Sequence, residues 1–160
     1  MKTSRIISLF TVLIIVMVAL VYNSCKKDNE EEPPPTGPVY TNGEGEIGPI
    51  GGTVKIEDPS SPINGASVQI PAGALSGNVT IKISKAPIGT YLPGDSSLTL
   101  IKMEPAGLVF QQPVTLGIPY TKYSNPSNLT IFYYNPDSLQ IFEIQKTSVD
   151  ATNKVVYGKT

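Results

Sequence analysis

Residues 79–83, with the sequence Val-Thr-Ile-Lys-Ile, form the clearest structural pattern in this chain. Apolar side chains occupy every second position, and Thr80 and Lys82 separate them. Successive side chains of a β-strand point to opposite faces of its sheet, so the alternation predicts a strand with one buried face and one solvated face.

The same period of two recurs in short runs throughout residues 43–160, and turn-forming Gly, Pro, Asn, Asp and Ser separate the runs. Many short strands with this spacing are typical of all-β architectures, and no helical apolar stripe occurs in this region. We therefore expect one all-β domain over residues 43–160, an antiparallel β-sandwich or a partly open barrel. The further runs are Thr53–Ile56, Ser67–Ile70, Leu98–Leu100, Val114–Ile118, Leu129–Tyr133, Leu139–Ile144 and Val155–Tyr157.

Two segments are more specific than the alternation. Residues 68–75 read VQIPAGAL, and residues 104–120 read EPAGLVFQQPVTLGIPY. Together they resemble the ZU5 domain, a β domain of ankyrins, netrin receptors and many bacterial surface proteins. The resemblance implies a β-sandwich module. It leaves open whether the family's last strand is missing, because the chain ends at Thr160 directly after its last predicted strand.

The residues of these motifs have structural roles and carry no reactive chemistry. Pro71 and Gly73 should turn the chain out of its sheet. We expect Phe110 to bury its ring between the sheets and Pro113 to start an edge or bulged strand, where a missing N–H is tolerated. The motif is therefore interpreted as a folding signature and not as a binding site.

The N-terminus carries the pattern of a secretory signal. Lys2 and Arg5 precede the apolar run Ile6–Val21, and the only cysteine of the chain, Cys25, follows it. Residues 1–24 are similar to a helical Bacteroidetes-type lipoprotein signal peptide, which would make Cys25 the lipid-accepting N-terminus of the mature protein. The alternative is a single transmembrane anchor, although spanning a bilayer takes about 20 apolar residues.

Residues 25–42 are charged, rich in proline and nearly free of apolar side chains. Such a segment cannot bury enough surface to offset its ordering entropy, so we expect a disordered, acidic tether. Its run Lys27–Glu32 resembles the export signal that sends Bacteroidetes lipoproteins to the cell surface. This resemblance implies a lipid-anchored protein exposed on the outer membrane, and the alternative is the periplasmic face of that membrane.

The composition argues against several functions. The chain has no histidine, which excludes Ser-His-Asp and Cys-His catalysis and histidine-based zinc sites. Its net charge of −1 and its lack of arginine after Arg5 leave no basic stripe for nucleic acid. Within residues 43–160, carboxylates are scattered, apart from the neighbours Glu57 and Asp58. We therefore expect a protein that is not an enzyme, with no catalytic residues, no cofactor and no metal.

Two candidate sites remain. Tyr120, Tyr123, Tyr133 and Tyr134 could form an aromatic platform for sugar stacking, although tyrosine is also favoured on strands for purely structural reasons. Asp137-Ser138-Leu139 resembles the short acceptor pattern for O-glycosylation of exported Bacteroidetes proteins, which makes Ser138 a candidate site. The alternative for Ser138 is an ordinary turn residue.

These features together predict a lipid-anchored extracytoplasmic module that binds or assembles with proteins at the cell envelope. Its partners would be the membrane, through the lipid on Cys25, and a protein of unknown identity. The alternative is a carbohydrate-binding accessory domain whose partner is a surface glycan.

The lipid anchor is tested by replacing Cys25 with alanine. A single acyl chain gives an association constant of only about 10⁴ M⁻¹, so stable anchoring needs the several chains of a lipoprotein N-terminus. We expect radiolabelled palmitate to enter the wild-type protein and to be absent from Cys25→Ala. Equal labelling of the two proteins would contradict lipidation at this residue.

Overall fold

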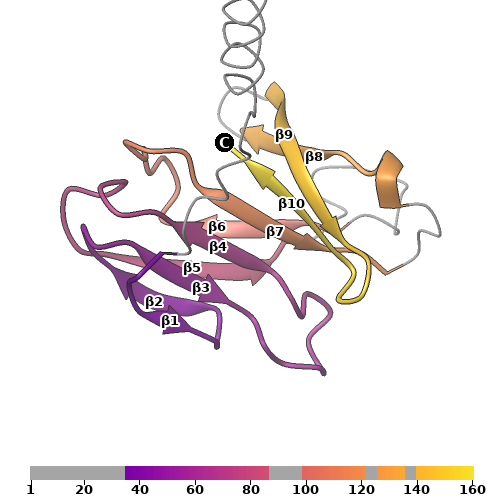
Figure 1. The fold of residues 1–160 in the computed structure, drawn as a ribbon, viewed down its shortest axis with the longest axis horizontal. Helices are drawn as coiled ribbons and strands as arrows, with labels where there is room; N and C mark the ends of the chain where they lie inside the picture. The colour runs from indigo at the N-terminus through magenta and orange to yellow at the C-terminus, as the bar shows by residue number, and fades with distance from the viewer. Residues whose placement is uncertain (1–34, 87–98, 122–125, 136–139) are drawn as a thin grey trace, which may run out of the picture. The chain divides into compact units, whose positions relative to one another are not determined.

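The computed structural model describes residues 35–86, 99–121, 126–135 and 140–160, which fold as ten β-strands and one short 3₁₀ helix, Pro126–Asn128 (Figure 1). A seven-stranded sheet has the order β1-β3-β4-β7-β10-β9-β8, and a three-stranded sheet has the order β2-β5-β6. The larger sheet contains β1 (Val39–Tyr40), β3 (Gly52–Lys55), β4 (Ser67–Ile70), β7 (Thr115–Pro119), β8 (Ile131–Asn135), β9 (Gln140–Asp150) and β10 (Val155–Lys159). The smaller sheet contains β2 (Glu44–Ile47), β5 (Val79–Lys85) and β6 (Ile101–Glu104).

The predicted all-β sandwich is confirmed, with one difference in strand direction. Neighbouring strands pair antiparallel except β1 and β3, which run parallel with Val39 opposite Thr53. The chain crosses from β1 to the smaller sheet and back before it enters β3, which sets this direction. Within the described part of the chain, no helix has the length and apolar character needed to cross a membrane.

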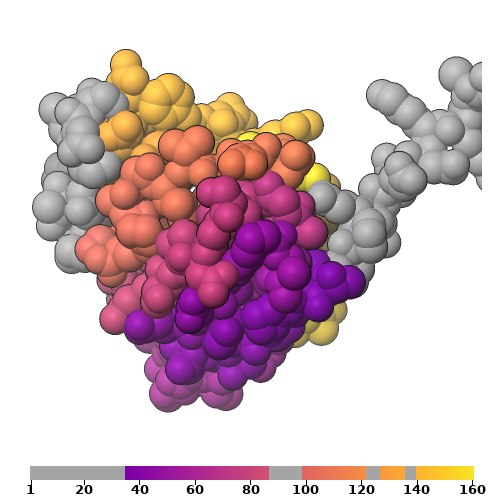
Figure 2. All heavy atoms as spheres, turned by 90° about the vertical axis from the view of Figure 1, so that its left-hand side faces the viewer, coloured from indigo at the N-terminus to yellow at the C-terminus, as the bar shows by residue number. Residues whose placement is uncertain are grey.

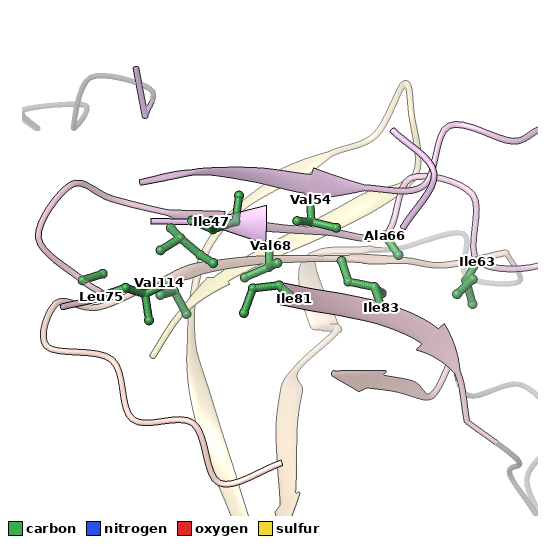
Figure 3. Close-up of a cluster of buried hydrophobic side chains, with 11 residues drawn as sticks. Ile47, Val54, Ile63, Ala66, Val68, Leu75, Ile81, Ile83 and Val114 are labelled. Atoms are coloured by element: carbon green, nitrogen blue, oxygen red, sulfur yellow. The ribbon is translucent and has the colours of Figure 1, made fainter. Parts of the chain in front are cut away.

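The main core lies between the two sheets (Figure 3). Ile81 is fully buried and Ile83 is nearly so, while Thr80 and Lys82 are exposed, as the alternation predicts. Figure 3 shows Ile81 and Ile83 of β5 facing Val68 of the larger sheet. The buried members of this cluster are Ile47, Val54, Ile63, Ala66, Val68, Ile70, Ala74, Leu75, Ile81, Ile83 and Val114.

Three expectations from the sequence need correction. Of the strand predicted at Leu98–Leu100, Leu98 lies outside the described residues, and Leu100 precedes β6, whose side chains packed against the core are Ile101 and Met103. Phe110 packs against the core but is only partly buried. Pro113 precedes β7, which is an inner strand between β4 and β10 and not an edge. Because Pro113 lies outside the strand, its missing N–H breaks no strand pairing.

Two glycines show why the chain can change direction near the core. Gly73 has a φ of 78°, in the left-handed region, and directs the chain out of β4 as the IPAGAL motif predicts. Gly43 has a φ of 79° and lies where the chain passes between the sheets. Its N–H donates to the Lys55 carbonyl of β3, and its carbonyl accepts from Ile83 N–H of β5. Gly43 therefore connects the backbones of both sheets.

A second, smaller cluster lies where the larger sheet extends beyond the smaller one. Tyr120, Ile131, Ile144 and Val156 form it, and no residue of β2, β5 or β6 takes part. The pairing of β9 with β10 shifts register between Tyr157 and Gly158, and such a bulge bends and twists a strand. The bulge lies where β10 pairs with the middle of β9, and there side chains of β8 and β9 pack against Gly158 of β10.

Gly158 allows this packing because it has no side chain. A Cβ atom at this position would lie 2.9 Å from Ile131 Cδ1, 2.9 Å from Ile144 Cγ2 and 3.2 Å from the Gln145 carbonyl oxygen. Since both isoleucines belong to the second cluster, Gly158 sets how closely the β8–β9 hairpin can approach β10.

We expect Gly158→Ala to lower the free energy of unfolding by about 1–3 kcal/mol, because the added methyl group overpacks the second cluster. Gly77→Ala is the matched control, since a Cβ atom there would meet nothing within 4 Å. Urea unfolding of both variants measures the difference. Equal midpoints would show that the hairpin adjusts to the methyl group without cost.

Candidate interaction surface on strands β8 and β9

The hairpin of β8 and β9 has two faces that can be assigned from its register. Ile131 pairs with Ile144, Phe132 with Glu143, Tyr133 with Phe142 and Tyr134 with Ile141. Side chains of directly opposed residues lie on the same face of an antiparallel pair. One face therefore carries Ile131, Tyr133, Phe142 and Ile144, and the other carries Phe132, Tyr134, Ile141 and Glu143.

Apolar side chains are exposed on both faces. Phe132 is 59% exposed, Tyr133 49%, Ile141 57% and Phe142 48%. We call these four residues the β8–β9 patch. Figure 2 shows the orange-to-yellow atoms around β8 and the start of β9 along the top of the molecule, above the indigo N-terminal strands. Grouped exposed apolar residues of this kind are typical of interaction sites, whereas single ones are ordinary.

One face of the patch carries a stacked aromatic pair. The rings of Tyr133 and Phe142 stack with their centroids 6.3 Å apart and their planes inclined by 23°. On the same face, Ile131 and Ile144 are only 6% and 7% exposed and belong to the second cluster. The aromatic pair therefore lies next to a buried isoleucine pair on the same face, while about half of each aromatic residue remains open to solvent.

The four predicted tyrosines do not form one platform. Tyr120 is 8% exposed and packs in the second cluster, so its ring offers no free face and this part of the prediction is wrong. Tyr133 is exposed, and Tyr134 is half-buried on the opposite face of β8. Tyr123, Ser138 and Cys25 lie outside the described residues.

The sequence did contain a sign of the patch. Phe132-Tyr133-Tyr134 and Ile141-Phe142 are consecutive apolar or aromatic residues within strands. Since neighbouring residues face opposite ways, such a run requires either cover on both faces or exposed apolar side chains on one. The sequence analysis considered only the tyrosines, so it missed Phe132, Ile141 and Phe142.

Several carboxylates of the described residues serve local structure. A hollow of about 430 Å³ is lined by Thr41, Asn42, Ile56, Glu57, Asp58 and Ser61. Of the two acids there, Glu57 pairs with Lys55, and Asp58 accepts hydrogen bonds from Ser60 Oγ and Ser60 N–H at 2.6 and 2.9 Å. These bonds lower the pKa of Asp58. Within the described ranges, no three His, Cys, Asp or Glu residues are grouped closely enough to hold a metal ion.

Asp150 closes the turn that joins β9 to β10. Its carboxylate accepts hydrogen bonds from Asn153 N–H at 2.9 Å, Asn153 Nδ2 at 2.7 Å and Thr152 N–H at 3.0 Å. The bonds from Asn153, and then that from Thr152, lower the pKa of Asp150 because they favour its charged form. Lys154 follows with a φ of 55°, which completes the tight turn.

Comparisons with known proteins gave no identification: no protein-family model matches the chain, and no curated protein matches it.

The turn at Asp150 predicts a dependence of stability on pH. Its pKa is lower in the folded protein, so its stabilising contribution is complete above the unfolded pKa of about 3.9 and is lost as pH falls through the folded value. We expect the urea midpoint of Asp150→Asn to fall less steeply below about pH 4 than that of the wild type. Parallel curves for the two proteins would assign the acid sensitivity to other groups.

Proposed function

We propose that this protein is a lipid-anchored extracytoplasmic module that makes protein–protein contacts at the cell envelope. The β8–β9 patch is the observation that supports this function best. It combines four exposed large apolar side chains with a single charged residue, Glu143, within the paired segments 131–135 and 140–144. Aromatic enrichment with few charges is typical of the centre of a protein interface.

The sequence supports the anchor and the location. Cys25 follows an apolar signal segment, and the tether at residues 25–42 would separate the β domain from the membrane. The resemblance to ZU5 domains is in keeping with a binding module. We propose the outer membrane as the location, with the domain exposed at the cell surface.

A carbohydrate-binding accessory domain is the second candidate, and the stacked pair Tyr133 and Phe142 favours it. Half-exposed rings at a small interplanar angle can offer an apolar face to a sugar ring. The adjoining Phe132 and Ile141 project from the opposite face of the hairpin, so a sugar stacked on Tyr133 would leave them uncovered. A protein partner that encloses the hairpin would cover both faces.

The proposal is tested by placing a charge in the patch. We expect Phe132→Asp to abolish capture of envelope proteins by chemical cross-linking on intact cells, because the partner would have to bury a carboxylate. Val109→Asp is the matched control, since Val109 is 82% exposed and lies outside the patch. Both residues are exposed, so both variants should keep the wild-type urea midpoint.

Cross-linking that is the same in the wild type and in Phe132→Asp would contradict a protein interface at the patch. Binding of the wild type to a glycan array, lost in Phe142→Ala and retained in Phe132→Asp, would support the carbohydrate function in its place.

A further inference from the structure

The exposed large apolar side chains of the described residues fall into two groups. Four of them form the β8–β9 patch. The other three are Val39, Ile50 and Val109, which are 57%, 63% and 82% exposed. These three come from segments that are far apart in the sequence, and the fold brings the segments to one end of the domain. Grouped exposed apolar residues mark sites of contact with proteins or with membranes.

Three loops meet at this end of the domain, and we call them the loop end. They are residues 48–51 between β2 and β3, residues 71–78 between β4 and β5, and residues 105–113 between β6 and β7. The middle loop is bonded to both others, because Gly73 N–H donates to the Pro49 carbonyl at 2.8 Å and Gln111 N–H donates to the Ala74 carbonyl at 2.9 Å. Figure 1 shows the loops at the left-hand side of the domain, the side that faces the viewer in Figure 2.

The loop end has apolar tips, no charge and a firm base. None of its residues is Asp, Glu, Lys or Arg. Ile50 and Val109 lie at its surface, in the first and the third loop. Below them, Leu75 of the middle loop is buried in the main core, and Figure 3 shows it next to Val114. Uncharged apolar tips of this kind are suited to the boundary between the headgroups and the acyl chains of a bilayer.

The chain that comes from the proposed lipid anchor enters the domain at the same end. The Pro38 carbonyl accepts a hydrogen bond at 2.9 Å from the N–H of Thr53, two residues after the first loop. Gly37 lies so close to this loop that a Cβ atom there would overlap the carbonyl oxygen of Gly51. The described chain therefore begins against the loop end.

The anchor would keep the loop end near the membrane. Residues 35–42 are part of the described domain, so residues 26–34 are the segment between Cys25 and that domain. A segment of this length spans at most about 30 Å when it is fully extended. A short connection of this kind raises the effective concentration of the loops at the bilayer, so a small apolar contact is enough to form.

We propose that the loop end rests on the bilayer that holds the lipid of Cys25, with Ile50 and Val109 at the boundary between headgroups and acyl chains. This inference rests on the anchor of the proposed function and adds an orientation for the domain. The loops have no basic residue that would attract anionic lipids, so we expect uncharged lipids to support the contact. The strands β8 and β9 contribute no residue to the loop end, so the β8–β9 patch is a separate surface.

Quenching of a fluorophore by labelled lipids measures the contact. The full-length Val109→Cys chain is purified with its lipid, labelled with a fluorophore and inserted into phosphatidylcholine vesicles that contain nitroxide-labelled phosphatidylcholine. We expect the quenching to be at least about fivefold stronger than for Ala151→Cys, because apolar residues at an interface lie about 5–10 Å into the boundary. Ala151 is an exposed residue in the turn before Val155, which pairs with the last residue of β7, whereas the third loop precedes the first residue of β7.

A charge in the first loop tests whether the loops contact the bilayer together. We expect Ile50→Asp to abolish the quenching at Val109→Cys, because insertion would take a carboxylate out of water. Ala151→Asp adds the same charge at the other end and should leave this quenching unchanged. Ile50 and Ala151 are both exposed, so both substitutions should keep the wild-type urea midpoint. Quenching that persists with Ile50→Asp would overturn the contact of the first loop.

The wild type and Val109→Asp separate this inference from the proposed function. Lipid on Cys25 would block its thiol, so uptake of the fluorophore by the wild type would contradict the anchor and overturn this inference with it. If Cys25 is blocked, equal quenching at Val109→Cys and Ala151→Cys would overturn the bilayer contact alone. Val109→Asp keeps its lipid and the β8–β9 patch, so it should still capture envelope proteins. Loss of that capture, together with equal quenching, would make the loop end a protein interface in place of a bilayer contact.

Discussion

The unequal size of the two sheets is the constraint on which the rest of this structure depends. Three strands cannot cover the inner face of a seven-stranded sheet. The smaller sheet covers the part around β3, β4 and the start of β7, where the fully buried residues Ile47, Val54, Val68 and Ile81 meet. The strands β10, β9 and β8 lie beyond that cover, so their apolar side chains must find other partners or remain in water.

The domain itself covers some of the apolar side chains of β8, β9 and β10. The register shift beside Gly158 and the absence of a side chain there let Ile131 of β8 and Ile144 of β9 pack close to β10. This packing buries Ile131, Ile144 and Val156 in a second cluster around Tyr120. Burial on this face of the hairpin ends at these residues. Among the described residues, no further layer lies against Tyr133 and Phe142. Full burial of one such side chain would stabilise the fold by about 1.5–3 kcal/mol. Tyr133 and Phe142 are each about half exposed, so each gains roughly half of that stabilisation.

The exposed β8–β9 patch follows from this limit of cover. Its four side chains lie where the larger sheet extends past the smaller one, and Glu143 is the single charged residue within the paired segments 131–135 and 140–144. A partner that covers these side chains would bury apolar surface that the domain itself leaves in water. This link between fold and surface is why we propose a binding function.

The sequence by itself determined the all-β class, most strand positions and the inward faces of the main core. It could do so because period-two alternation and turn residues such as Gly73 are local properties. It did not determine the parallel pairing of β1, the partial exposure of Phe110 or the burial of Tyr120. Those outcomes depend on which strands become neighbours. The alternation of apolar residues shows only which side chains share a face of a strand, and not what covers that face.

The exposure of the β8–β9 patch was decided by tertiary structure. Phe132-Tyr133-Tyr134 and Ile141-Phe142 read equally well as strands buried on both faces or as strands that expose one. Only the order of strands in the sheet placed them at its uncovered end, beyond the reach of the three-stranded layer. These side chains are exposed because the smaller sheet leaves part of the larger sheet uncovered. The size of that uncovered area depends on the two assembled sheets and not on any single strand.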